Sequence, residues 1–192
     1  RDRSVSRGLG DVYKRQLLAV ATGNKSELAC GYSTIYGDAV GGYAPIKDLL
    51  KTRVWEISRW RNKAAAAGVG IGGLKIVGNE DGNTGIPLKD GVMIPVSSIE
   101  KAPSAELRPG QKDSDSLPEY ALLDKVLAAY IEHAHGRADL LADGFDQVTV
   151  DTVMRLVDRA EWKRRQYPLG PKVTALAFGR DRRLPVTNAF RE

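Results

Sequence analysis

The chain has 192 residues, of which 42% are hydrophobic and 28% are charged, and its formal net charge is +5. This length and composition are typical of one globular domain with its own core, and they argue against a disordered chain. No apolar run approaches the roughly 20 residues that a membrane-spanning helix needs, and the single cysteine, Cys30, excludes an internal disulfide and suits a reducing, cytoplasmic compartment.

Residues 1–16 hold five basic and two acidic groups, show little apolar periodicity and contain no apolar stretch typical of a secretory leader. We expect them to be a non-native leader outside the fold. Residues 17–22, LLAVAT, form a short apolar run before a turn, which predicts a buried parallel strand. Asn24 followed by Glu27 fits a helix N-cap with an acidic residue three positions later.

Apolar side chains recur at helical spacing over residues 49–67, and this pattern predicts a long helix. The stretch of about residues 64–91 overlaps the end of this helix and continues into a run rich in Gly, Asn and Asp. This composition predicts a flexible insertion. The core face of the helix is expected to consist of Leu50, Val54, Ile57 and Trp60.

A second helix is predicted to begin with Ser116 as its N-cap and to end at Gly136. Two shorter helices are expected at residues 137–142 and 147–166. The segment KVTALAFG, residues 172–179, reads as a strand, and the remaining residues read as a loop.

Single residues at the start of the chain have both a structural and a functional interpretation. Glu27 can bind a hard cation through its carboxylate or serve only as part of the helix cap. Thr22 can donate its hydroxyl to a nucleotide or end a strand. Lys51 begins a helix, where the macrodipole disfavours a cation, so an anionic ligand would remove the conflict. A solvent-exposed lysine is the simpler interpretation.

The basic charge is concentrated near the C-terminus, where residues 160–192 hold eight basic and three acidic groups. Basic side chains mixed with aromatic rings can hold phosphate and stack a base, although a charged helix end is also commonly only solvated. A nucleic-acid-binding module is the alternative function, since residues 137–166 resemble a helix-turn-helix. The mixed basic and aromatic cluster comprises Trp162, Lys163, Arg164, Arg165, Tyr167 and Lys172.

Three long segments together carry a resemblance to a known family. They are ATGNKSELACGYSTIYGDAVGGYAPIKDLLKT, KAPSAELRPGQKDSDSLPEYALLDKVL and EWKRRQYPLGPKVTALAFGRDRRLPVTNAFRE. They closely resemble the synthetase domain of glutamine-dependent NAD+ synthetases over most of residues 17–62 and 94–192. The resemblance implies an α/β fold, a Rossmann-like doubly wound parallel sheet of the ATP pyrophosphatase type that lacks its N-terminal part, in a partial ligase domain at residues 17–192.

The resemblance also implies a reaction in which ATP adenylates the nicotinate carboxylate of deamido-NAD+ and ammonia, derived from glutamine, displaces AMP. It implies Mg2+, a homo-oligomer with sites at the subunit interface, and no nucleic-acid partner. A related ATP pyrophosphatase that amidates another acid is a further alternative. The implied ligands are Thr22, Lys51 and Ser104 for ATP; Glu27 for Mg2+; Asp38 as the catalytic residue; and Glu27, Tyr32, Ser33, Thr34, Ile35, Asp38, Lys163 and Lys172 for deamido-NAD+.

The sequence departs from this family pattern in two ways. Residues 64–91 look like an insertion, and the 192-residue sequence contains neither the SGGxDS loop that binds pyrophosphate in this family nor a glutaminase domain. That loop supplies backbone N–H groups to the phosphates of ATP. We therefore expect the parent enzyme to be a ligase and this chain by itself to be inactive.

Overall fold

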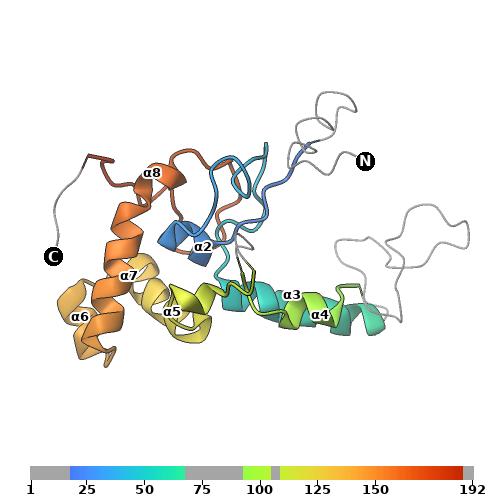
Figure 1. Cartoon of the computed structure of the whole chain (residues 1–192), viewed down its shortest axis with the longest axis horizontal. Coiled ribbons are helices and arrows are strands. Elements are labelled where there is room, and N and C mark those ends of the chain that lie inside the picture. The colour runs from blue at the N-terminus through green and yellow to red at the C-terminus, as the bar shows by residue number, and fades with distance from the viewer. Residues whose placement is uncertain (1–17, 68–92, 105–108, 188–192) are drawn as a thin grey trace, which may run out of the picture.

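The computed structural model describes residues 18–67, 93–104 and 109–187, and these parts of the chain are mostly helical (Figure 1). The predicted leader 1–16, and all of the predicted insertion 64–91 beyond residue 67, lie outside the described residues. The elements in chain order are α2 (Lys25–Cys30), α3 (Lys51–Ala66), α4 (Val96–Glu100), the 3-10 turn η1 (Asp113–Asp115), α5 (Tyr120–Leu127), the π-helical turn η2 (Ala128–Glu132), α6 (Arg137–Ala142), α7 (Gln147–Arg159) and α8 (Glu161–Arg164).

The prediction of two strands is wrong. Within the described ranges, the only β-pairing consists of isolated bridges. Val20 forms a single parallel bridge with Tyr43, and Phe178 bridges only to nearby Arg182. The backbone N–H groups of Val173 and Thr174 donate instead to one carboxylate oxygen of Asp48, each at 2.8 Å. The Asp48 side chain thus accepts hydrogen bonds from backbone N–H groups that would donate to a neighbouring strand in a sheet.

The core lies where α2, α5 and α7 pack against one another (Figure 1). Helix α7 buries Val150, Val153, Met154 and Val157, which share one face because they are three or four residues apart. Complete burial of each such side chain contributes about 1.5–3 kcal/mol. The cluster further includes Leu28, Ala29, Cys30, Leu117, Tyr120, Leu123, Val126, Leu127, Ala129, Tyr130, Ile131, Leu140 and Phe178.

The long helix predicted over residues 49–67 is confirmed as α3, but only part of its predicted core face is correct, because Leu50 packs against the core cluster and two other residues do not. Ile57 and Trp60 are 45% and 53% exposed. The reason is visible in Figure 1, where α3 contacts α5 and α2 but then runs away from the core, with the short α4 alongside it. Asn62 joins this pair, because its side-chain amide exchanges two hydrogen bonds with the backbone of Ile94.

The other predicted helices lie close to their expected positions, but some of their caps and ends differ from the prediction. Asn24 caps α2 and forms the predicted capping box with Glu27, and α6 has the predicted bounds. The predicted Ser116 cap is wrong, because α5 begins after Glu119 without a side-chain cap. The helix predicted over residues 147–166 is interrupted at Ala160, which separates α7 from α8.

Lys25 is completely buried and connects four separate segments of the chain. Its ammonium group lies 3.1 Å from Asp48 Oδ1 and 2.8 Å from Glu132 Oε1. It also donates to Thr174 Oγ1 at 2.5 Å and to the carbonyl of Leu176 at 2.8 Å. A buried ammonium is tolerated only when charges and hydrogen bonds compensate it, so these segments must stay together.

Arg164 is a second buried cation, and it satisfies the C-terminal carbonyls of two helices. Its guanidinium donates to the carbonyls of Leu28 and Ala29 in α2 and of Val157 in α7, at 3.3, 2.8 and 2.6 Å. Glu161 Oε2 accepts a further hydrogen bond at 3.0 Å. Burial lowers the pKa of Arg164, and Glu161 opposes that shift. The last turns of α2 and α7 are thereby tied to α8.

We expect Lys25→Met to lower the stability of the 192-residue chain by about 3–5 kcal/mol, because Asp48 and Glu132 would lose their buried counter-ion. Urea unfolding followed by far-ultraviolet circular dichroism measures the loss. Arg137→Gln is the matched control, since it removes an exposed cation whose Nε lies 2.7 Å from Asp151, and its midpoint should match that of the unchanged chain. Equal midpoints for both variants would contradict the role given to Lys25.

Candidate functional site

A cavity of about 340 Å³ opens where the turn before α2, the start of α3 and two later loops meet. Six of the residues selected from the sequence line this one cavity, although they are spread over more than eighty positions of the chain. Three residues that were not selected complete the wall. The lining comprises Thr22, Gly23, Glu27, Tyr32, Asp38, Lys51, Pro103, Ser104 and Asp113.

Glu27 and Lys51 form an ion pair in the wall of this cavity, with Glu27 Oε1 2.9 Å from Lys51 Nζ. The unfavourable position of Lys51 at a helix N-terminus is therefore neutralised within the chain. Glu27 Oε2 accepts from the backbone N–H of Asn24 at 3.1 Å. The cap interpretation of Glu27 is confirmed, and the same residue also lines the cavity.

The N-terminus of α3 is capped from outside the helix, which fixes where Lys51 lies. Its preceding residue, Leu50, offers no side-chain cap. Instead, Ser26 Oγ accepts from the backbone N–H of Lys51 at 2.9 Å, and Asp124 Oδ2 accepts from Thr52 N–H at 2.8 Å. Burial raises the pKa of the Asp124 carboxyl, and the hydrogen bonds from Ser26 and Thr52 oppose that shift.

Asp113 is the site residue that the sequence reasoning missed. It is 5% exposed, and its Oδ2 accepts from the Tyr120 hydroxyl at 2.7 Å. Its Oδ1 is buried and has no hydrogen-bond partner among the residues that the structure describes. Burial and the bond to Asp113 raise the pKa of Tyr120, which keeps that phenol protonated as a donor. A buried carboxylate oxygen without a partner is costly, so this atom is suited to a cation or a ligand donor.

The loop between α2 and Asp38 is closed by its own side chains. Asp38 Oδ2 accepts from the backbone N–H of Thr34 at 3.1 Å, and Thr34 Oγ1 accepts from Asp38 N–H at 3.2 Å. Tyr32 faces the cavity and accepts from Gln111 Nε2 at 3.3 Å. The selected residues Ser33, Thr34 and Ile35 belong to this loop but are not among the residues that line the cavity.

The two selected lysines of the C-terminal segment lie in different places. Lys163 Nζ donates to the carbonyls of Gly31 and Ser33 at 2.6 and 2.9 Å, so it holds the base of the loop. Lys172 pairs with Asp181 at 2.7 Å and lines a second cavity of about 400 Å³. The structure therefore does not bring Lys172 into the cavity that contains Glu27 and Lys51.

Tyr167 lines the second cavity and also contacts the first. Its hydroxyl donates at 3.4 Å to the carbonyl of Asp38, which lines the first cavity. A Cβ atom on Gly23 would lie 1.8 Å from this hydroxyl, so only glycine allows the contact. Burial, with smaller effects from Glu27 and Asp38, raises the pKa of Tyr167 to about 12.

The possible helix-turn-helix and the possible metal centre can also be compared with the structure. Helices α6 and α7 exist, but Asp146 is the N-cap of α7 and Asp151 lies on its exposed face, where negative charge repels DNA. The described ranges hold no cluster of three or more metal-ligating side chains. Within the same ranges, no helix has the length and apolarity required to cross a membrane.

Comparison with known proteins gives one consistent match. The NAD synthase family model matches residues 12–167. The glutamine-dependent NAD+ synthetase of Acinetobacter baylyi is 46% identical over 174 residues, which are 91% of this chain and 28% of that relative. The corresponding enzyme of Xanthomonas campestris is also 46% identical, over 90% of this chain and 27% of its own length.

The chain thus spans less than a third of the length of the curated relatives that it matches. A solved glutamine-dependent NAD+ synthetase from Cytophaga hutchinsonii superimposes with a TM-score of 0.63 over 97% of this chain and 28% of its own. At 20% identity this likeness concerns the fold alone. The family model covers well over half of the sequence, in agreement with the predicted resemblance, and the chain belongs to the NAD synthase family.

Proposed function

We propose that this chain supplies part of the substrate site of an ATP-dependent ligase that converts deamido-NAD+ to NAD+. The nicotinate carboxylate attacks the α-phosphate of ATP, giving an acyl-adenylate and pyrophosphate. Ammonia, derived from glutamine in the whole enzyme, then attacks the acyl carbon, and AMP leaves. The observation that supports this proposal is the meeting, in one cavity of about 340 Å³, of six residues that the family resemblance had selected.

In this proposal, ATP lies along the wall formed by Thr22, Lys51 and Ser104. The Thr22 hydroxyl contacts the adenosine part, while Lys51 and Ser104 contact the phosphates. A phosphate oxygen competes with Glu27 for the Lys51 ammonium, because these two side chains already form an ion pair in which each is 19% exposed. Binding of ATP therefore includes an exchange of partners at Lys51.

The donor set of the cavity fits a magnesium ion that is bound together with a nucleotide. Mg2+ is usually held by one or two carboxylates, with substrate phosphates and water as its other ligands. Glu27 and Asp113 line the same cavity, and Asp113 Oδ1 has no partner within the described residues. When bound there, Mg2+ would neutralise charge on the departing pyrophosphate.

The dinucleotide acid is proposed to bind beside the loop of Tyr32, Ser33, Thr34 and Ile35. Glu27 and Asp38 face it from the cavity, and Asp38 orients the nicotinate or the entering ammonia. Lys163 supports the loop through Gly31 and Ser33, so its contribution includes placing these residues. Lys172, in contrast, lines the second cavity. It can contact the dinucleotide acid only if that ligand extends from the first cavity into the second. A homo-oligomer with sites at the subunit interface, and a cytoplasmic location, remain parts of the same proposal.

A domain-replacement experiment tests the proposed function. The matching segment of the Acinetobacter baylyi relative is replaced by this chain, and NAD+ formation from deamido-NAD+, Mg2+ and ATP is measured with ammonia and with glutamine. We expect activity with both nitrogen sources. The 192-residue chain alone should form no NAD+, because its sequence has no SGGxDS loop. A folded but inactive chimera would overturn the proposal.

In the active chimera, Lys51→Gln should raise the KM for ATP about ten- to hundredfold. The estimate follows from the loss of a charged contact to phosphate, which contributes about 1.5–3 kcal/mol. Lys125→Gln is the matched control, since Lys125 is exposed on α5 and away from the cavity. Steady-state kinetics at saturating deamido-NAD+ measure the effect, and an unchanged KM in the Lys51 variant would exclude its phosphate contact.

Asp113→Asn should raise the Mg2+ concentration required for half-maximal activity by about tenfold, which corresponds to about 1.4 kcal/mol. The amide keeps an acceptor for the Tyr120 hydroxyl and removes an uncompensated buried oxygen, so the thermal midpoint should not fall. Asp115→Asn is the comparison variant, because Asp115 is nearby but does not line the cavity. If the Asp113 variant has the normal metal requirement, Asp113 does not face the ion.

A further inference from the structure

Tyr167 reaches the wall of the first cavity although it is not one of the residues that line it. The family resemblance assigns this tyrosine no ligand. Its hydroxyl donates to the carbonyl of Asp38 at 3.4 Å, and a backbone hydrogen bond from Gly23 opposes the rise in its pKa that burial causes. Gly23 and Asp38 both line the first cavity. One phenolic hydroxyl therefore lies between two separate parts of that wall.

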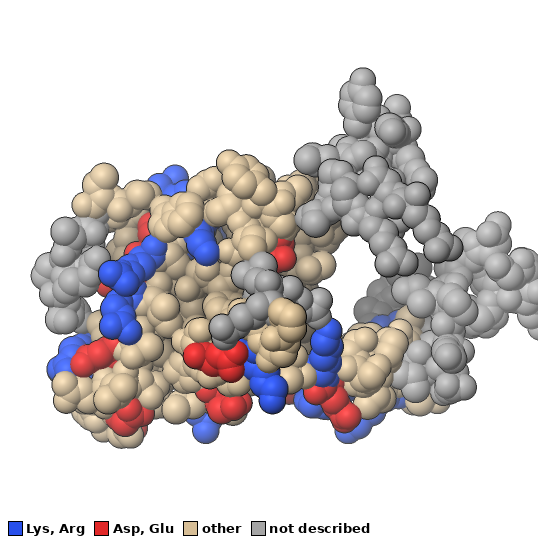
Figure 2. All heavy atoms as spheres, viewed as in Figure 1, with Lys and Arg blue, Asp and Glu red and all other residues tan. Residues whose placement is uncertain are grey.

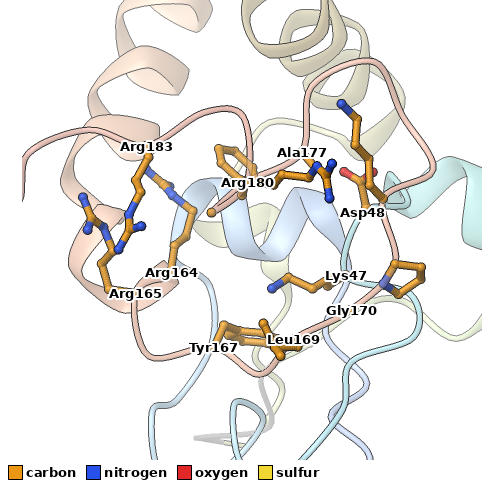
Figure 3. Close-up of a pocket in the computed structure, with 14 residues that line it drawn as sticks. Lys47, Asp48, Arg164, Arg165, Tyr167, Leu169, Gly170, Ala177, Arg180 and Arg183 are labelled. Carbon is orange, nitrogen blue, oxygen red and sulfur yellow. The ribbon is translucent and has the colours of Figure 1, made fainter.

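The segment that carries Tyr167 is held firmly against the residues before α3. Lys47 Nζ donates to the carbonyl of Pro168 at 2.7 Å, and the carbonyl of Leu169 accepts from the backbone N–H of Ala44 at 2.8 Å. Figure 3 shows Lys47 beside Tyr167, and its ammonium nitrogen lies 5.9 Å from the centre of the Tyr167 ring. The hydroxyl is thus presented from a fixed support.

Asp38, in contrast, is exposed, and its own polar groups bond within its loop. Its Oδ2 accepts from the backbone N–H of Thr34, and its N–H donates to Thr34 Oγ1. Such local bonds fix the shape of the loop but not its place against the rest of the fold. Lys163 holds the base of the loop, and the Tyr167 hydroxyl ties Asp38 to a residue 129 positions later in the chain.

Gly23 leaves the space that the hydroxyl occupies. A Cβ atom at this position would lie 1.8 Å from the hydroxyl oxygen of Tyr167 and 2.9 Å from its Cζ. The ring of Tyr167 packs against the core cluster, so it cannot withdraw from a larger residue without losing that contact. The hydroxyl consequently sets the separation between the turn of Thr22 and Gly23 on one side and Asp38 on the other.

We propose that Tyr167 is a positioning residue of the first cavity, whose hydroxyl holds the backbone of Asp38 at a fixed separation from the turn of Thr22 and Gly23. Its consequence for catalysis rests on the proposed function, in which Asp38 orients the nicotinate or the entering ammonia. Tyr167 then acts through Asp38. The position of the loop itself can be measured in the absence of any reaction.

Amide hydrogen exchange of the 192-residue chain, resolved by nuclear magnetic resonance, tests the positioning directly. Tyr167→Phe keeps the ring and removes the hydroxyl. It should speed exchange of the Asp38 and Ala39 amides at least about threefold, because both amides bond to Thr34 in the loop that the hydroxyl holds. Unchanged exchange at these two amides would overturn the proposal.

Tyr130→Phe is the matched control. It removes a hydroxyl that donates to Asp158 at 3.2 Å, and Tyr130 lines neither cavity. The Asp38 and Ala39 amides should therefore exchange at their normal rates in this variant. Each replacement is neutral, so the Lys, Arg, Asp and Glu side chains that lie interspersed on the face shown in Figure 2 stay the same. Equal acceleration in the two tyrosine variants would count against a specific role for Tyr167.

Gly23→Ala tests the same contact from the other side. The added methyl group would displace the Tyr167 hydroxyl, so the variant should also speed exchange of the Asp38 amide. In Gly23→Ala combined with Tyr167→Phe the clash with the hydroxyl is gone. Exchange in this double variant should be no faster than in the faster single variant, because both changes act on one contact. Accelerations that multiply would show two independent effects and overturn the proposal.

In the active chimera, Tyr167→Phe should lower kcat about three- to tenfold and leave the KM for ATP unchanged. This pattern is the opposite of that expected for Lys51→Gln, and Tyr130→Phe should keep the normal kcat. A normal kcat in the Tyr167 variant would overturn its part in catalysis. An inactive chimera would overturn the proposed function instead, and the exchange rates of Asp38 and Ala39 would still decide whether Tyr167 positions the loop.

Discussion

The buried ammonium group of Lys25 is the contact on which the arrangement of this protein depends. It joins α2 to Asp48, to Glu132 at the end of η2, and to the segment of Thr174 and Leu176. A charge without access to water must keep its partners close, so these distant parts of the chain cannot separate independently. Because α2 also carries Glu27, the same contact determines where the first cavity lies relative to the C-terminal segment.

The Glu27–Lys51 ion pair of the first cavity forms before any ligand binds, and this has consequences for binding. Glu27 and Lys51 hold each other at 2.9 Å, so an incoming phosphate and an incoming cation would each replace one member of the pair. Such an exchange favours the joint binding of a metal and a nucleotide. A phosphate alone would leave Glu27 unpaired, and a cation alone would leave Lys51 unpaired. Asp113 provides the one additional carboxylate oxygen in this cavity that no described group satisfies.

The two cavities differ in charge although Tyr167 contacts both. The first contains a balanced ion pair and two further carboxylates, Asp38 and Asp113, whereas cations outnumber carboxylates around the second. Tyr167 lines the second cavity, and its hydroxyl donates to the carbonyl of Asp38 in the first. Gly23 permits this close contact.

Local patterns in the sequence were sufficient to predict the capping box of Asn24 and Glu27, the long helix α3 and the bounds of α6, and the family resemblance selected six of the nine residues that line the first cavity. These features depend on neighbouring residues or on family motifs that persist in the linear order. Only the tertiary structure showed that Ile57 and Trp60 are exposed, that Asp48 binds the backbone of the predicted strand at residues 172–179, and that Asp113 has an unsatisfied oxygen. Only the tertiary structure likewise separated Lys172 from Lys163. Burial and the pairing of distant charges depend on which segments meet in space, and spacing along the chain carries no information about that.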